Sequence, residues 1–200
     1  MRTIDYSNIT PQRKAIGVND KFGNKGIKKQ QGSTVIKYDT LPLDGRTVFR
    51  FFEGSAQRNF PLSNTGSDGN KLGVGSTMVV ERAYLSVISY DPVTNTITDI
   101  EALDLPTVAF APITGGEFGL SIANTDVIKN VPILSWLPEF NKVAENQLNT
   151  NFEFDTQAVI PPLLEYVAQV TTAGAATIEG KYLRLTLEGA GAIIAPRNTF

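Results

Sequence analysis

Three stretches of this chain alternate apolar and polar residues strictly, and this alternation constrains the fold more than any other feature. The apolar positions are Phe118, Leu120 and Ile122 within 117–124, Phe152 and Phe154 within 151–155, and Leu183, Leu185 and Leu187 within 182–188. A period of two places these residues on one face of a strand and the polar residues on the other. One buried face and one solvated face are typical of antiparallel sheets in sandwiches and barrels.

Other segments also predict strands, because they are short runs rich in β-branched and aromatic residues. These segments are Ser33–Tyr38, Thr47–Glu53, Met78–Tyr90, Thr96–Leu103 and Leu164–Thr171. The stretch Leu41–Gly45 predicts a turn after the first of them, and Asp91–Asn95 predicts a hairpin connection.

One helix is expected, since Phe140, Val143, Ala144 and Leu148 follow Pro138 at helical spacing. Trp136 is expected to pack in the core beneath it. Short strands, wide loops and one short helix together predict an all-β antiparallel sandwich, with a single jelly roll as the expected topology.

The N-terminal region differs from the rest of the chain. Its apolar residues follow neither period, and Gly17, Gly23, Gly26 and Gly32 interrupt it. Such a segment buries too little of itself to offset its ordering entropy. We therefore expect residues 1–32 to form an extended arm and residues 33–200 to form the β-sandwich domain. The arm either lies against another surface or is a disordered tail, and the sequence leaves both readings open.

Charge is distributed unevenly between these regions. Residues 1–40 hold eight basic and three acidic residues, a net charge of +5, whereas residues 41–200 carry −7. A basic arm on an acidic body favours contact with nucleic acid, an anionic lipid surface or a neighbouring copy of the chain. The residues expected to make this contact are Arg13, Lys14, Lys21, Lys25, Lys28 and Lys29.

The chain contains no cysteine and no histidine. Without cysteine there are no disulfides, no zinc–thiolate sites and no thiol nucleophile. Without histidine the chain lacks the commonest general base near neutral pH and the commonest transition-metal ligand. We therefore expect a protein that is not an enzyme and that holds no cofactor, metal or small-molecule substrate.

Three remaining patterns favour ordinary structural roles. The glycine-rich stretch 72–77 lacks the lysine of a phosphate-binding loop and precedes a predicted strand, so it is interpreted as a loop entering that strand. Asp68 in the 63–75 loop indicates a turn, although a loosely organised calcium site there stays open. The carboxylates that could form a glycosidase pair occupy polar faces of strands, where solvated charges belong; these are Glu117, Glu153, Asp155, Glu165 and Glu188.

The chain resembles jelly-roll capsid subunits of icosahedral bacteriophages. The likeness rests on the Lys/Asn/Gly-rich leader, on Thr47–Glu53 with the Asn/Gly/Ser-rich loop after it, and on the closing segment Lys181–Gly189. This resemblance implies a shell subunit, major, minor or vertex, whose arms and loops join neighbouring copies and other virion proteins. It also implies a protein made in the host cytoplasm and located in the virion.

The leading hypothesis is accordingly a virion structural protein that forms homo-oligomers. The alternative is a receptor- or carbohydrate-binding β-sandwich module of a phage fibre, which would need exposed aromatic residues on its loops. A carboxylate-dependent polysaccharide-cleaving enzyme is a third hypothesis, opposed by the placement of the acidic residues.

Overall fold

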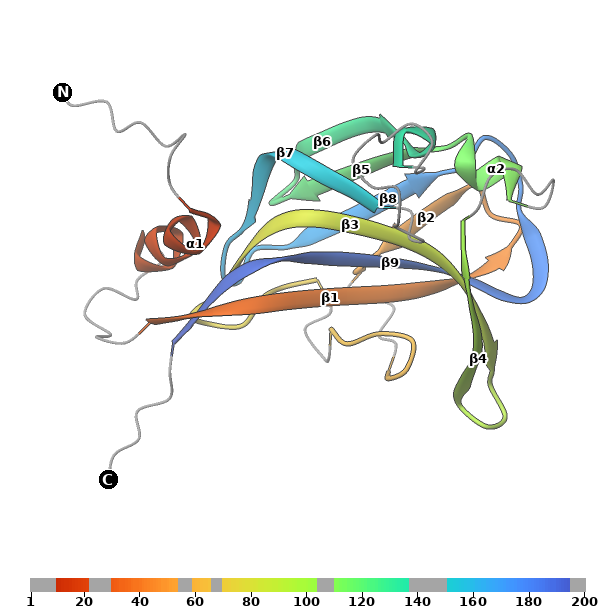
Figure 1. Cartoon of the computed structure of the whole chain (residues 1–200), viewed down its shortest axis with the longest axis horizontal. Coiled ribbons are helices and arrows are strands. Elements are labelled where there is room, and N and C mark those ends of the chain that lie inside the picture. The colour runs from red at the N-terminus through yellow and green to blue at the C-terminus, as the bar shows by residue number, and fades with distance from the viewer. Residues whose placement is uncertain are drawn as a thin grey trace.

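The structure, a computed structural model of the chain, describes residues 10–21, 30–53, 59–65, 70–103, 110–136 and 151–194 (Figure 1). Its elements in chain order are α1 (Pro11–Asn19), β1 (Gln30–Asp44), β2 (Val48–Phe51), β3 (Ser76–Asp91), β4 (Thr96–Ala102), α2 (Ala111–Thr114), β5 (Glu117–Ile122), β6 (Thr125–Pro132), the 3-10 turn η3 (Ile133–Trp136), β7 (Asn151–Ile160), β8 (Tyr166–Thr171) and β9 (Thr177–Ile194).

Two antiparallel sheets make up the molecule, which confirms the predicted all-β sandwich. Sheet A has the order β1-β9-β3-β4, with β7 also pairing with β3, and sheet B has the order β2-β8-β5-β6. β4 is the return strand of a hairpin with β3, as the sequence predicts. With β4 set aside, every connection between successive strands crosses from one sheet to the other, except the β5–β6 hairpin. This is the strand order of an eight-stranded jelly roll, the expected topology.

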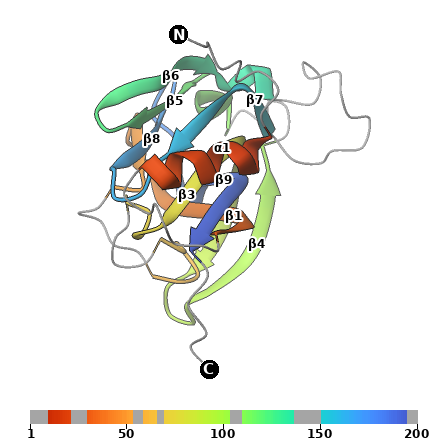
Figure 2. The same ribbon diagram turned by 90° about the vertical axis from the view of Figure 1, so that its left-hand side faces the viewer.

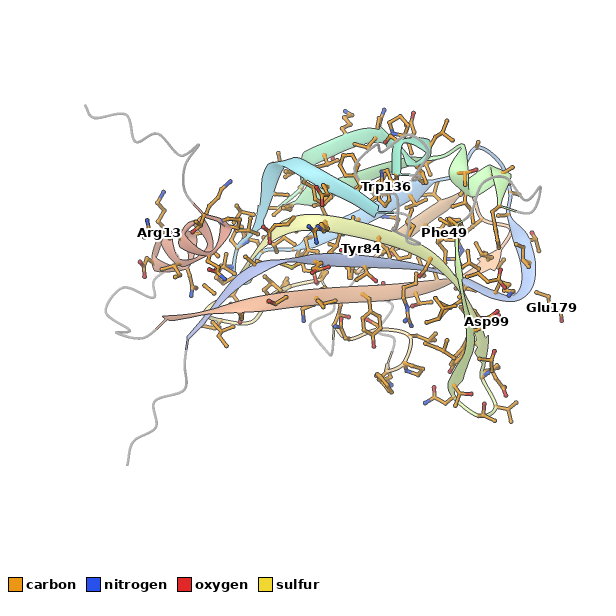
Figure 3. All side chains as sticks on the ribbon, viewed as in Figure 1. Arg13, Phe49, Tyr84, Asp99, Trp136 and Glu179 are labelled. Atoms are coloured by element: carbon orange, nitrogen blue, oxygen red, sulfur yellow. The ribbon has the colours of Figure 1, made fainter. Side chains whose placement is uncertain are left out.

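The core lies between the sheets, where the alternating segments place their apolar residues. Phe118, Leu120, Leu183, Leu185 and Leu187 are all almost completely buried. Trp136 is 1% exposed, and its ring lies 5.0 Å from that of Phe118 and 5.6 Å from that of Phe152 (Figure 3). The prediction that Trp136 belongs to the core is therefore confirmed, while the helix predicted after Pro138 lies outside the described residues.

Helix α1 occupies part of the region in which an extended arm was predicted. Pro11 stands at its first turn, where the fixed φ of proline suits a helix. Ala15 is fully buried against Val79 and Ala192 on the outer surface of sheet A, and α1 lies across β9 and β3 in Figure 2. The prediction of extended chain is thus wrong for residues 11–19. The helix was missed because it docks through a small side chain, so it shows no stripe of large apolar residues.

Several strand assignments also differ from the expectations. β1 continues through Leu41 and Leu43, both buried, so the predicted turn at Leu41–Gly45 is wrong except at Gly45, whose φ of 90° ends the strand. β6 was not predicted, and β9 extends six residues beyond the predicted end at Glu188. Among the described residues no helix is long and apolar enough to cross a bilayer.

Candidate functional site

The basic residues predicted to contact a partner are only partly described. Arg13 and Lys21 are exposed and Lys14 is half-buried, while Lys25, Lys28 and Lys29 lie outside the described residues. Arg13 points away from the body on α1 (Figure 3). Because α1 is docked on sheet A, the charges of Arg13 and Lys21 are held at a fixed place on the surface rather than on a free arm.

A groove of about 440 Å³ lies beside β1 and reaches Ile193 of β9 and Ser76 and Thr77 at the start of β3. Residues 33–37 of β1 form one side, and Thr65, Lys71, Leu72 and Gly73 contribute to the other. Sequence reasoning did not predict this groove, because its two sides come from segments that are distant in the chain.

The backbone of β1 is unpaired along part of this groove. β1 is an edge strand whose other side pairs with β9. Asn64 covers one stretch of the edge: its Oδ1 accepts the N–H of Tyr38 (2.9 Å), and its Nδ2 donates to the carbonyl of Ile36 (2.8 Å). Successive residues of a strand point their backbone groups to opposite sides, so the N–H groups of Thr34 and Ile36 also face away from β9. In the described part of the chain these two N–H groups have no partner.

Lys37 brings a charge to the same groove. Its side chain is half-buried, and burial lowers the pKa of its ammonium group. No residue of the described segments forms an ion pair or hydrogen bond with it. Lys71 across the groove is exposed and pairs with Glu165 at 3.2 Å. Ser33 adds a buried hydroxyl without a hydrogen-bond partner within the described structure. A partly desolvated ammonium group beside free N–H donors is suited to a carboxylate or another oxyanion.

The sequence contained a signal for Lys37 that was not used. Lys37 has the same strand parity as Leu41 and Leu43, which are 4% and 3% exposed. A lysine at a core-facing position of an edge strand is unusual, since its charge is partly removed from water.

A second polar surface covers the outer face of sheet A. Tyr38, Tyr84, Tyr90 and Tyr182 are all partly exposed there. The Arg184 guanidinium lies 4.6 Å from the centre of the Tyr38 ring, and the ring of Tyr90 is 5.4 Å from that of Tyr182. Tyrosine and arginine are enriched at protein interfaces because they combine apolar area with hydrogen-bonding groups.

The patterns considered for catalysis or metal binding occupy structural positions. The 72–77 stretch leads directly into β3, as predicted, and Asp68 lies outside the described residues. Glu117 is exposed, Glu153 pairs with Arg82 at 3.0 Å, and Glu188 accepts a hydrogen bond of 2.7 Å from the Tyr84 hydroxyl. The side chain of Asp155 is outside the described set. Within the described segments no three acidic side chains are grouped closely enough to hold a metal ion.

Comparison with known proteins adds no assignment. Neither the models of protein families nor the curated proteins contain a match for this chain. The resemblance to phage capsid subunits therefore stays a prediction, and the function has to be argued from the fold and from the groove.

Proposed function

We propose that this protein is a non-enzymatic structural subunit of a virion shell, which assembles with copies of itself and with other virion proteins. The observation that carries the proposal is the groove along β1, where unpaired backbone donors lie beside the half-buried Lys37. A partly desolvated charge without a partner is unfavourable in an isolated subunit, and a docking partner with a carboxylate would relieve that cost. The jelly-roll strand order agrees with the proposal, although a fold by itself does not define a function.

The N-terminal helix supplies a second contact in this proposal. α1 and the turn that follows it present Arg13 and Lys21 to solvent on the outside of sheet A. These charges suit non-specific contact with nucleic acid or with an anionic lipid surface inside a particle, because electrostatic attraction to phosphate groups does not depend on the base sequence. The protein would then be made in the host cytoplasm and reside in the virion.

Assembly of the purified protein tests the proposal directly. Sedimentation velocity over a range of concentrations, followed by negative-stain electron microscopy, is expected to reveal oligomers of regular form. A chain that stays monomeric at the highest concentration, and that co-assembles with none of the proteins encoded beside it, would refute the proposed function.

The tyrosine-rich outer face of sheet A favours a second candidate, a receptor- or carbohydrate-binding module of a phage fibre. Tyr90 and Tyr182 form an aromatic pair, and partly exposed aromatic rings can stack on sugars. In that case a glycan array would give a binding signal that Tyr182→Ala abolishes, while the oligomeric state would not change. Loss of assembly on the same substitution would instead make this face part of a protein interface.

A further inference from the structure

Both outer edges of sheet A carry unpaired backbone, and the pairing pattern identifies which residues carry it. In β1 the even-numbered residues face away from β9, so the odd-numbered Lys37 forms a hydrogen-bonded pair with Leu187. Hydrogen-bonded and non-hydrogen-bonded pairs alternate in the same way between β9 and β3 and between β3 and β4. This alternation makes Ser89 of β3 and Asp99 of β4 a hydrogen-bonded pair at the other edge. The backbone of Ile100 therefore faces outward from β4.

A hydrogen bond within β4 agrees with this assignment. The N–H of Ile100 donates to Oδ1 of its neighbour Asp99 at 2.8 Å, and Ile100 is 64% exposed. Asp99 lies on a hairpin that projects from the body of the molecule (Figure 3). The edge of β4 is thus open to solvent, and its outward N–H is held by an acidic side chain.

The two edges match in charge and in the face on which each side chain lies. Residues opposite each other across a sheet share a face. Asp99 lies opposite Ser89, on the core-facing side of sheet A, and Lys37 has the same orientation in β1. Ile100 lies on the outer side, as does Ile36, which is 49% exposed. An acidic residue and an isoleucine on one edge therefore correspond to a lysine and an isoleucine on the other.

The edges also match in direction. β1, β9, β3 and β4 are successively antiparallel, so β4 runs antiparallel to β1. A second copy in the same orientation therefore presents its β4 antiparallel to β1 of the first copy. The antiparallel order of sheet A would then continue from one subunit into the next.

We propose that β4 of one copy adds to the edge of β1 of the next, with Ile100 opposite Ile36 and Asp99 opposite Lys37. In this register the unpaired N–H of Ile36 donates to the carbonyl of Ile100, and the N–H of Ile100 replaces the Asn64 amide as the donor to the carbonyl of Ile36. The carboxylate of Asp99 leaves the N–H of Ile100 and pairs with the ammonium group of Lys37 in the groove. This inference rests on the proposed assembly function and names the surface that performs it.

Lys37 also gives the contact its specificity. A lysine facing inward on an edge strand normally prevents pairing, because an incoming strand would have to desolvate its charge. Only a strand that places a carboxylate on the same face escapes that penalty, and β4 does so at Asp99. The contact joins two different edges, so it builds rings or filaments rather than closed dimers.

Charge reversal tests the register with two variants that complement each other. In Lys37→Glu the introduced carboxylate of one copy repels Asp99 of the next, and in Asp99→Lys the introduced ammonium group repels Lys37. Each variant alone is expected to need a concentration about tenfold or more above that of the wild type for half-assembly. An equimolar mixture restores attraction where unlike copies meet, because each introduced charge then faces its opposite, and it is expected to assemble with alternating copies. Lys129→Glu, an exposed change on β6 of the other sheet, is the matched control and should assemble as the wild type does.

Cross-linking supplies a measurement that does not depend on charge. The chain has no cysteine, so Ile36→Cys and Ile100→Cys each introduce a single thiol. Opposite residues of a hydrogen-bonded antiparallel pair have Cα atoms about 5.5 Å apart, within reach of a disulfide. Mild oxidation of the mixed variants should give a disulfide between unlike copies, in preference to disulfides between like copies.

The results separate this inference from the proposed function. If the wild type assembles but both charge-reversed proteins assemble equally well, or if the thiols form no preferential cross-link, the β1–β4 contact is refuted while assembly stands. If Lys37 serves only to prevent pairing, Lys37→Met will increase self-association, whereas the proposed contact predicts a decrease. A wild-type protein that never assembles refutes both proposals.

Discussion

Replacing Gly189 of β9 with alanine should destabilise the protein strongly, because the strand has no room for a side chain there. A Cβ built at this position overlaps the carbonyl oxygen of Val79 and lies 2.8 Å from Val79 C and 3.0 Å from Val80 Cα. Carbon atoms prefer separations of about 3.5–4.0 Å, so the backbone of β3 or β9 must move by roughly 1 Å. Backbone cannot rotate away as a side chain can.

The magnitude follows from two opposing effects. Overpacking costs about 1–3 kcal/mol, and the close Val80–Gly189 pairing places this site at the upper end of that range. The reduced entropy of the unfolded chain offsets about 0.4–1 kcal/mol. The net loss of about 2 kcal/mol should lower Tm by about 4–8 °C in a chain of this size.

Gly17→Ala is the matched control for this prediction. It makes the same chemical change on the exposed side of α1, where a Cβ would meet no atom within 4 Å. Alanine favours the helix by about 0.5–1 kcal/mol, so Tm should not fall. Thermal unfolding followed by circular dichroism measures both variants. If Gly189→Ala proves as stable as the wild type, the close approach of β9 and β3 inferred from the structure is wrong.

Three further substitutions test the core through the stability of the protein. Asp39→Ala should cost about 1–3 kcal/mol in urea unfolding, since the buried carboxylate accepts the N–H of Phe52 at 2.7 Å and that donor would lose its partner. Trp136→Ala should cost about 3–5 kcal/mol, because the side chain is 1% exposed. Burial, and to a smaller extent the charge of the nearby Asp39, raises the pKa of Tyr166 above its usual value of 10.0. The unfolded chain therefore loses this proton at a lower pH than the folded protein does, and the free energy of unfolding decreases as pH rises above about 10. Tyr166→Phe should flatten that alkaline decline, and an unchanged pH profile would contradict the assignment.

The strands that were predicted correctly are those whose inner faces carry large apolar residues. β9 was predicted only to Glu188, because the four residues after it, 189–192, are glycine and alanine, which have little strand preference. In the structure these small residues serve close packing: Gly189 lies against β3, and Ala192 is covered by Ala15 of α1. A pattern of small residues indicates an approach between elements only when the partner element is known, so neither α1 nor the end of β9 was predicted.

Pro42 explains the misplaced turn. Proline cannot donate a ladder hydrogen bond, so the sequence around it was interpreted as the end of a strand. In the structure Pro42 lies opposite Tyr182 and is an even-numbered residue of β1, so its nitrogen faces the free edge. No ladder hydrogen bond is lost there, and the strand continues. The position of a proline relative to the sheet edge, which decides its effect, is a tertiary property.

The candidate groove depended on similar tertiary information. The sequence predicted a basic N-terminal surface, yet it gave no role to Lys37, which lines the groove. Because alternate residues of a strand share a face, the buried Leu41 and Leu43 would have assigned Lys37 to the core-facing side of sheet A. The free edge beside it could not be predicted, because that edge depends on which strand occupies the border of sheet A.

The five border strands of the described sheets, β1, β4 and β7 in sheet A and β2 and β6 in sheet B, differ in how well they resist pairing, and this difference supports assembly through β1 and β4. In sheet B, β2 has only four residues, and the pairing of β6 with β5 shifts register near Leu120, so neither offers a long regular edge. β1 pairs with β9 without a shift from Gln30 to Pro42, and β4 is seven residues long and pairs with β3 without a shift from Asp99 to Ala102. Short strands and bulges are the usual protection against unwanted pairing. In the contact proposed between copies, β1 and β4 rely instead on Lys37 and Asp99, two opposite charges that oppose pairing separately and favour it when they meet.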